Sequence, residues 1–159
     1  MQNTQITQIV NQPSSAYRSA SIVTLAVGIV GFLLGLWNAE LVLSEKGFYL
    51  AVFLLSLFSA VALQKTVRDI AEGIDVTKMF TTICWGAFFS SIALLAIGLF
   101  NAQMLLSEKG FYAMSFIVSL FAVITVQKNT RDIAADKTDE LTVSQTEQEQ
   151  LKTVEKSSS

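Results

Sequence analysis

Four long stretches of this chain contain no charged residue, and each is long enough to cross a lipid bilayer as a helix. They cover residues 19–39, 47–64, 79–107 and 110–127 and are rich in Leu, Ile, Val, Phe and Ala. An α-helix rises about 1.5 Å per residue, so the shortest stretches reach roughly 27 Å across a hydrocarbon core about 30 Å thick. Lysine side chains that follow these stretches can extend to the membrane surface and make up the remaining distance.

A soluble bundle or a membrane barrel fits this pattern poorly. Soluble helices confine their apolar residues to one stripe, whereas Leu33-Leu34 and Phe88-Phe89 put large apolar groups on adjacent faces. Charged residues make up only 15% of the chain, against about 25% in soluble domains. The stretches also lack the alternation of barrel strands. The sequence therefore predicts an all-α membrane protein with four transmembrane helices.

The second half of the chain repeats the first. Between residues 35–71 and 98–134, 21 of 37 positions are identical without a gap. The segment Leu-Ser-Glu-Lys-Gly-Phe-Tyr at 43–49 returns unchanged at 106–112. This match indicates duplication of one helical hairpin. The expected hairpins are residues 18–73, with spans at about 19–39 and 47–64, and residues 74–135, with spans at about 80–103 and 110–127.

Local signals suggest how each hairpin is built. Ser44 and Ser107 are expected to cap the second helix of each pair, and the turn charges Glu45 and Glu108 are expected to lie in solvent. Gly47 and Gly110 are expected to relieve crowding where helices meet. Lys65 precedes Asp69 by four residues, a stabilising spacing that Lys128 and Asp132 repeat. Gly73 is expected to end the first hairpin.

The distribution of Lys and Arg predicts how the chain crosses the membrane. Near the ends of the spans, seven of these residues fall on the side of the two termini and two on the side of the Ser-Glu-Lys-Gly turns. Both termini are therefore expected in the cytoplasm. Because an even number of helices separates the hairpins, we expect a parallel repeat about an axis along the membrane normal. Residues 1–17 form a polar N-terminal tail. The polar C-terminal tail, residues 136–159, is expected to be disordered, with at most a marginal helix at 139–155.

Several chemistries are not expected. The chain has no histidine and one cysteine, Cys84, so common metal sites and an internal disulfide are excluded. The segments typical of nucleotide, phosphate or nucleophile sites do not occur. The net charge of -2 does not favour nucleic acid. We expect no catalytic, cofactor or metal site and no enzymatic activity.

A polar patch is the first candidate site, formed by Asn38, Glu40, Asn101 and Gln103 near the ends of the first and third spans. An amide at membrane depth needs hydrogen-bond partners. It either lines a solute path or, as we favour, joins helices and meets interfacial water. The aromatic residues near the span ends are typical of an interfacial belt rather than a ligand cage.

Two further sets are candidates for contacts rather than chemistry. The basic residues Lys65, Arg68, Lys128 and Arg131 suit an anionic headgroup or a protein partner, although anchoring at the membrane surface explains them as well. Small residues permit close approach of helices in lipid. Those expected at packing faces are Gly28, Gly31, Gly35, Ser91 and Gly98.

The repeated pattern Gly-Leu-(Trp/Phe)-Asn-Ala, Leu-Ser-Glu-Lys-Gly-Phe-Tyr, Gln-Lys and Arg-Asp resembles the YiaA/YiaB family of small bacterial inner-membrane proteins. The resemblance covers residues 16–135 and implies a multi-pass protein of the bacterial inner membrane. It implies no activity. The leading hypothesis is a non-enzymatic structural or accessory component that packs with itself or with other membrane proteins. The alternative is a small ion or solute transporter or channel subunit acting as a homo-oligomer.

Overall fold

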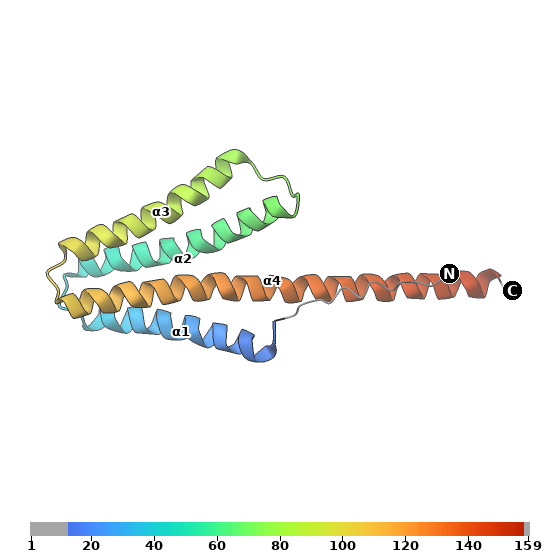
Figure 1. Cartoon of the computed structure of the whole chain (residues 1–159), viewed down its shortest axis with the longest axis horizontal. Helices are drawn as coiled ribbons and strands as arrows, with labels where there is room; N and C mark the ends of the chain where they lie inside the picture. Colours follow the sequence, from blue (N-terminus) through green and yellow to red (C-terminus); the bar gives the residue numbers. More distant parts are fainter. Residues whose placement is uncertain (1–12, 158–159) are drawn as a thin grey trace.

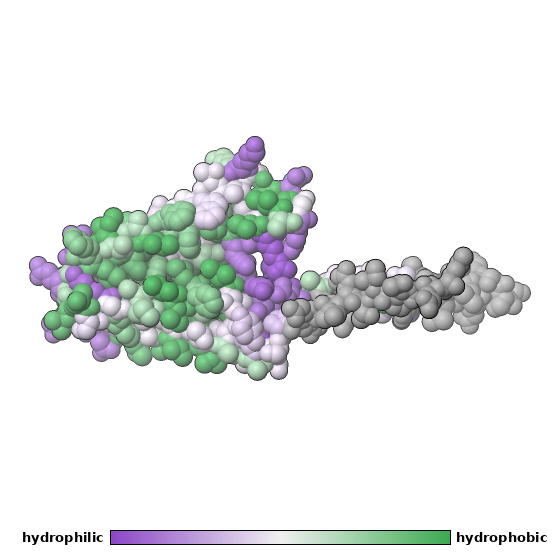
Figure 2. Space-filling view, viewed as in Figure 1, coloured by the Kyte–Doolittle hydropathy of each residue, from purple (hydrophilic) through white to green (hydrophobic). Residues whose placement is uncertain are grey.

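The computed structural model describes residues 13–157, and the regular structure of this part is entirely helical. The helices run alternately in opposite directions (Figure 1), and each contains a stretch long and apolar enough to cross a membrane. Apolar side chains cover the body of the bundle, and hydrophilic residues gather at its two ends (Figure 2). The helices are α1 (Ser15–Asn38), α2 (Leu43–Ala71), α3 (Lys78–Asn101) and α4 (Leu106–Ser157).

The two repeats exchange partners. The main neighbour of α1 is α4, the main neighbour of α2 is α3, and α2 also meets α4, whereas α1 touches α2 less. The first helix of each repeat therefore packs mainly on the second helix of the other repeat. Because α1 and α3 run in one direction and α2 and α4 in the other (Figure 1), the repeats are parallel. An approximate two-fold axis lies between α2 and α4.

Aromatic rings fill the core around this axis. Phe32 stacks on Phe53 with ring centroids 4.1 Å apart, and Phe53 lies 6.3 Å from its repeat counterpart Phe116. The counterparts Tyr49 and Tyr112 are stacked at 6.3 Å. Stacked and edge-to-face pairs of this kind contribute about 0.5–1.5 kcal/mol each beyond the area they bury. The middle of the bundle is thus packed with side chains.

Small residues allow the paired helices to approach. A Cβ at Gly28 would lie 2.5 Å from Ser119 Oγ and 3.2 Å from Ser119 N. A Cβ at Gly35 would lie 2.7 Å from a ring carbon of Phe111, and one at Gly98 would lie 2.8 Å from the matching carbon of Phe48. Gly31 has looser contacts with α4. These glycines therefore face a helix of the other repeat.

Glutamate and lysine fix the short α1–α2 and α3–α4 connections. The helix α2 begins at Leu43, so Ser44 lies inside its first turn, and the expectation that Ser44 is the cap is wrong. Glu45 Oε2 instead accepts the Val42 N–H at 3.0 Å, the glutamate half of a capping box. Lys46 Nζ donates to the Trp37 carbonyl at the end of α1, 3.0 Å away, where the helix dipole favours a cation.

The second repeat builds its connection in the same way. Glu108 accepts the Leu105 N–H at 2.9 Å, and Lys109 donates to the Phe100 carbonyl at 3.2 Å. Because α4 begins at Leu106, Ser107 is also inside the first turn rather than at the cap. A Cβ at Gly47 or Gly110 would meet no described atom within 4 Å. The expectation that these two glycines relieve crowding between helices is therefore wrong.

Glycine ends α2 as expected, whereas α4 continues much farther than expected. Gly73 has φ +76°, and the Ile74 N–H donates to the Asp69 carbonyl, as in a Schellman cap. The helix α4 reaches Ser157, which differs from the disordered tail expected over residues 136–159. The reason is that residues 111–157 contain neither glycine nor proline, so no strong helix breaker interrupts α4.

A methyl group at Gly28 is expected to destabilise the bundle. Gly28→Ala forces α1 away from Ser119 on α4, and overpacking of this kind typically costs about 1–3 kcal/mol. Thermal unfolding in mild detergent is expected to show a lower midpoint. Gly86→Ala is the matched control. A Cβ at Gly86 would meet nothing within 4 Å, and the substitution gives the same gain in helix propensity as Gly28→Ala. Equal midpoints for the two variants would contradict the observed α1–α4 contact.

Candidate functional site

Two matching hollows lie at the end of the bundle that carries the α1–α2 and α3–α4 connections, here called the loop end. We call them the twin hollows. One has a volume of about 290 Å³, between the start of α2 and the end of α3; the other, about 300 Å³, lies between the start of α4 and the end of α1. The first is lined by Ser44, Glu45, Phe48, Tyr49, Gly98, Asn101 and Ala102. The second is lined by Gly35, Asn38, Ala39, Ser107, Glu108, Phe111 and Tyr112.

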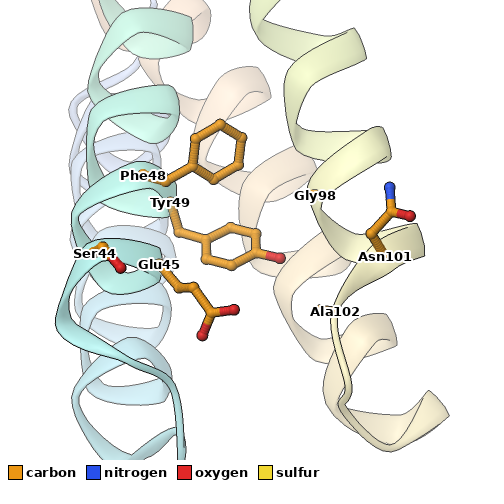
Figure 3. A pocket seen from close by; sticks show the side chains of 7 residues that line it. All are labelled: Ser44, Glu45, Phe48, Tyr49, Gly98, Asn101 and Ala102. Atoms are coloured by element: carbon orange, nitrogen blue, oxygen red, sulfur yellow. The ribbon is translucent and has the colours of Figure 1, made fainter.

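Tyr49 and Glu45 project into the first hollow. Figure 3 shows both side chains reaching from α2 toward the Gly98–Ala102 segment of α3, with the hydroxyl and the carboxylate on the same side. Glycine at position 98 is needed here, because a Cβ would lie 3.2 Å from a Tyr49 ring carbon. Tyr49 and Glu45 therefore place a hydroxyl and a carboxylate in the hollow, beside the rings of Phe48 and Tyr49.

The amides of Asn38 and Asn101, two residues of the candidate polar patch, donate hydrogen bonds to carbonyls of their own helices. Asn38 Nδ2 donates to the Leu34 carbonyl and Asn101 Nδ2 to the Ile97 carbonyl, both at 2.8 Å. In Figure 3 the Asn101 side chain points away from Tyr49 and Glu45. Both asparagines are exposed at the bundle end. Their amide hydrogens are thus satisfied locally rather than by a neighbouring helix.

The four residues of the candidate polar patch do not form one site. Asn38, Glu40 and Gln103 line a third hollow of about 560 Å³ between the two connections, together with Glu108. Asn101 does not line this hollow; it belongs to the first of the twin hollows. The structure therefore brings together three of the four residues, at the mouth of the bundle rather than within it.

At the opposite end, here called the arginine end, two ion pairs cross the approximate two-fold axis. Arg68 on α2 donates to Asp132 on α4 at 2.8 Å, and Arg131 on α4 lies 3.2 Å from Asp69 on α2. Glu72 pairs with both arginines, at 2.7 and 3.1 Å. These contacts hold the ends of α2 and α4 together, and they use the arginines that were candidates for a headgroup or partner.

Lys65 and Lys128 differ in their surroundings. Lys65 forms the expected pair with Asp69. The spacing of Lys128 and Asp132 predicts the same pair, but Asp132 accepts from Arg68 instead, and Lys128 is exposed. Asp69 lies beyond the charge-free stretch 47–64, and its pKa is lowered from its usual value, chiefly by the hydrogen bond from Lys65 and further by Arg131.

Buried polar groups beside the arginines lack partners among the described residues. They are Gln64 Oε1, its counterpart Gln127 Oε1 and Arg131 Nη1. Nearby, Asn129 donates to Ser21 at 3.2 Å, and the counterpart pair Thr66 and Cys84 lies 3.7 Å apart. The arginine end is thus a polar layer across all four helices, and Cys84 is a buried free thiol within it.

Sequence reasoning missed the role of Tyr49, Tyr112, Glu45 and Glu108 in the twin hollows. The tyrosines were expected in an interfacial belt, yet they are buried, with 4% and 3% of their surface exposed. Their repetition in the unchanged segments 43–49 and 106–112 was the available signal. It could not show that the segment of one repeat faces the first helix of the other.

Comparisons with known proteins agree with this duplicated architecture. A family model described as the yiaA/B two helix domain matches twice, at residues 17–69 and 80–132. The chain is 52% identical over 134 residues to the inner membrane protein YiaA of Escherichia coli, covering 84% of this chain and 92% of that protein.

More distant relatives cover less of the chain. Inner membrane protein YiaB of Escherichia coli is 34% identical, with 60% of this chain and 80% of that protein covered. The uncharacterized membrane protein YubF of Bacillus subtilis is 43% identical, with 38% of this chain and 70% of that protein covered. No solved structure matches. The two matched domains and the four membrane-length helices show that this chain belongs to the YiaA/YiaB two-helix-domain family.

Proposed function

We propose that this protein is a non-enzymatic component of the bacterial inner membrane that assembles with itself or with other membrane proteins. The packed interior supports this proposal most strongly. Phe32 and Phe53 are buried at the centre, and the buried serines donate to carbonyls of their own helices, as Ser56 does to Phe53 and Ser119 to Ser115. The hydroxyl hydrogens of these two serines are therefore used within their own helices and are not offered to a solute.

The projecting part of α4 supports assembly as well. Beyond the bundle the helix extends past the ends of α1, α2 and α3 (Figure 1), and these three helices do not accompany it. Leu141 and Val143 are exposed there. An isolated polar helix is marginal in water, and most helical stability comes from packing against a neighbour. A second protein or a second copy of this chain that covers this helix would stabilise it.

The alternative is a transporter or channel subunit, favoured by the third hollow at the loop end. Asn38, Glu40, Gln103 and Glu108 line this hollow, as a solute entrance would require. Below it, however, the stacked rings of Tyr49 and Tyr112 occupy the axis. A transport path would therefore have to form between subunits.

Extraction of the intact protein from its native membrane in mild detergent, followed by native mass spectrometry, tests the assembly proposal. We expect a complex of defined stoichiometry, containing either several copies of this chain or a foreign membrane protein. A monomer alone, together with flux of protons, alkali cations or small anions in reconstituted vesicles, would instead support transport. In that case Asn38→Leu with Asn101→Leu is the variant to test for loss of flux.

Reporter fusions test the proposed orientation, with both termini in the cytoplasm. A reporter active only outside the cytoplasm is expected to be silent when fused after Ser159. It is expected to be active when the chain is truncated after Leu105, in the α3–α4 connection, because three spans then precede it. The proposal follows from the excess of Lys and Arg at the arginine end, and the reverse pattern of activity would refute it.

A further inference from the structure

We propose that each of the twin hollows binds a primary ammonium group, carried either by an ethanolamine phospholipid or by a free amine. The inference rests on the chemistry of the two hollows and does not depend on the assembly proposed above.

The tyrosine hydroxyls are the first observation. Tyr49 and Tyr112 are 4% and 3% exposed, and the Tyr49 hydroxyl points into the first hollow (Figure 3). Among the described residues no hydrogen bond of either hydroxyl is found. Neither hydroxyl oxygen is among the buried polar atoms that lack a partner, so each is open to its hollow, where a polar group that enters can pair with it.

The carboxylates are the second observation. Glu45 uses Oε2 to cap α2, which leaves Oε1 available, and Glu108 does the same for α4. The residues that line the two hollows include no lysine or arginine. The Lys109 ammonium borders the first hollow, but it donates to the Phe100 carbonyl at the end of α3 and does not line the hollow. Glu45 is the charged residue among the lining residues, and its free oxygen can accept a hydrogen bond from a cation.

The remaining lining groups select an ammonium group among cations. In the first hollow the Phe48 and Tyr49 rings meet edge to face at 5.4 Å, and aromatic faces attract ammonium ions. The Ser44 and Tyr49 hydroxyls and the carboxylate can accept hydrogen bonds. A primary ammonium group has three N–H donors to match them, whereas a quaternary ammonium group has none. The volume of about 290 Å³ suits a small headgroup.

Duplication of the chain is the third observation. All seven residues that line the first hollow have an identical counterpart in the second, although only 21 of the 37 aligned positions are identical between the repeats. Packing explains the glycines and the aromatic rings. It does not explain the tyrosine hydroxyls, because phenylalanine has the same ring. The carboxylates also stabilise the first turn of their helices through the helix dipole. A ligand that pairs with the hydroxyls explains why both copies keep tyrosine.

Native mass spectrometry of the delipidated full-length protein, with added phosphatidylethanolamine or phosphatidylcholine of the same acyl chains, tests the proposal. We expect two phosphatidylethanolamine molecules per chain, one after Glu45→Gln, and none after Glu45→Gln with Glu108→Gln. Glu40→Gln is the matched control and should retain two, since this carboxylate lies at the same end but outside the twin hollows. Unchanged retention in the double variant, or equal retention of phosphatidylcholine, would overturn the proposal.

Free ethanolamine distinguishes the two sources of the ammonium group. If it displaces the lipid and raises the melting temperature of the wild type but not of the double glutamine variant, a free amine is sufficient. If the lipid binds and ethanolamine does not compete, the phospholipid is the ligand. If neither binds to the wild type, the proposal is wrong.

A second pair of substitutions tests the proposal independently, in case the glutamine variants fail to fold. Tyr49→Phe with Tyr112→Phe keeps the packed rings and removes only the hydroxyls. It is expected to weaken binding about tenfold, the effect of losing one hydrogen bond to a charged group. Unchanged affinity in this variant, with a melting temperature equal to that of the wild type, would remove the hydroxyls from the site and refute the proposal.

Discussion

The contact between α2 and α4 is the interaction on which the rest of the structure depends. These helices come from different repeats and meet at the approximate two-fold axis, where Phe53 lies beside Phe116 and Tyr49 beside Tyr112. Because the second helices occupy the centre, each first helix packs on the second helix of the other repeat. The twin hollows and the crossed ion pairs both follow from this exchange.

One short segment performs several tasks in each repeat. In residues 43–49 the glutamate caps its own helix, the lysine holds the end of the preceding helix, and the tyrosine enters the core. The same tyrosine and glutamate also line a hollow. This combination accounts for the unchanged copy at 106–112, since a substitution there would disturb the connection, the core and the hollow together.

The two ends of the bundle differ in how their charges are used. At the arginine end, Arg68, Arg131, Asp69 and Asp132 neutralise one another across the axis, which leaves little charge for a ligand. At the loop end, Lys46 and Lys109 are occupied by helix-end carbonyls, and the glutamates keep an oxygen free. The two ends therefore differ: the loop end leaves one glutamate oxygen free in each repeat, whereas the arginine end leaves Gln64 Oε1, Gln127 Oε1 and Arg131 Nη1 without partners among the described residues.

The sequence by itself determined the fold class, the four spans and the parallel repeat. Charge-free stretches can be stable in a bilayer only as helices whose backbone groups are satisfied internally, and this constraint acts on each segment separately. The sequence also placed Gly28, Gly35 and Gly98 at packing faces, because small residues are the local requirement for close approach in lipid. It located Asn38 and Asn101 near the span ends but did not show that both amides bond their own helix.

Only the tertiary structure decided which helices pair. Small and aromatic residues can pack against a helix of either repeat, so the pattern along the chain does not distinguish a closed hairpin from the exchanged arrangement. Packing of the whole bundle also decides that Asp132 pairs with Arg68 rather than with Lys128. Spacing along one helix does not show which residues a neighbouring helix brings near. The hollows arise where Tyr49 of one repeat faces Gly98 of the other, a proximity between residues far apart in sequence that packing of the whole bundle creates.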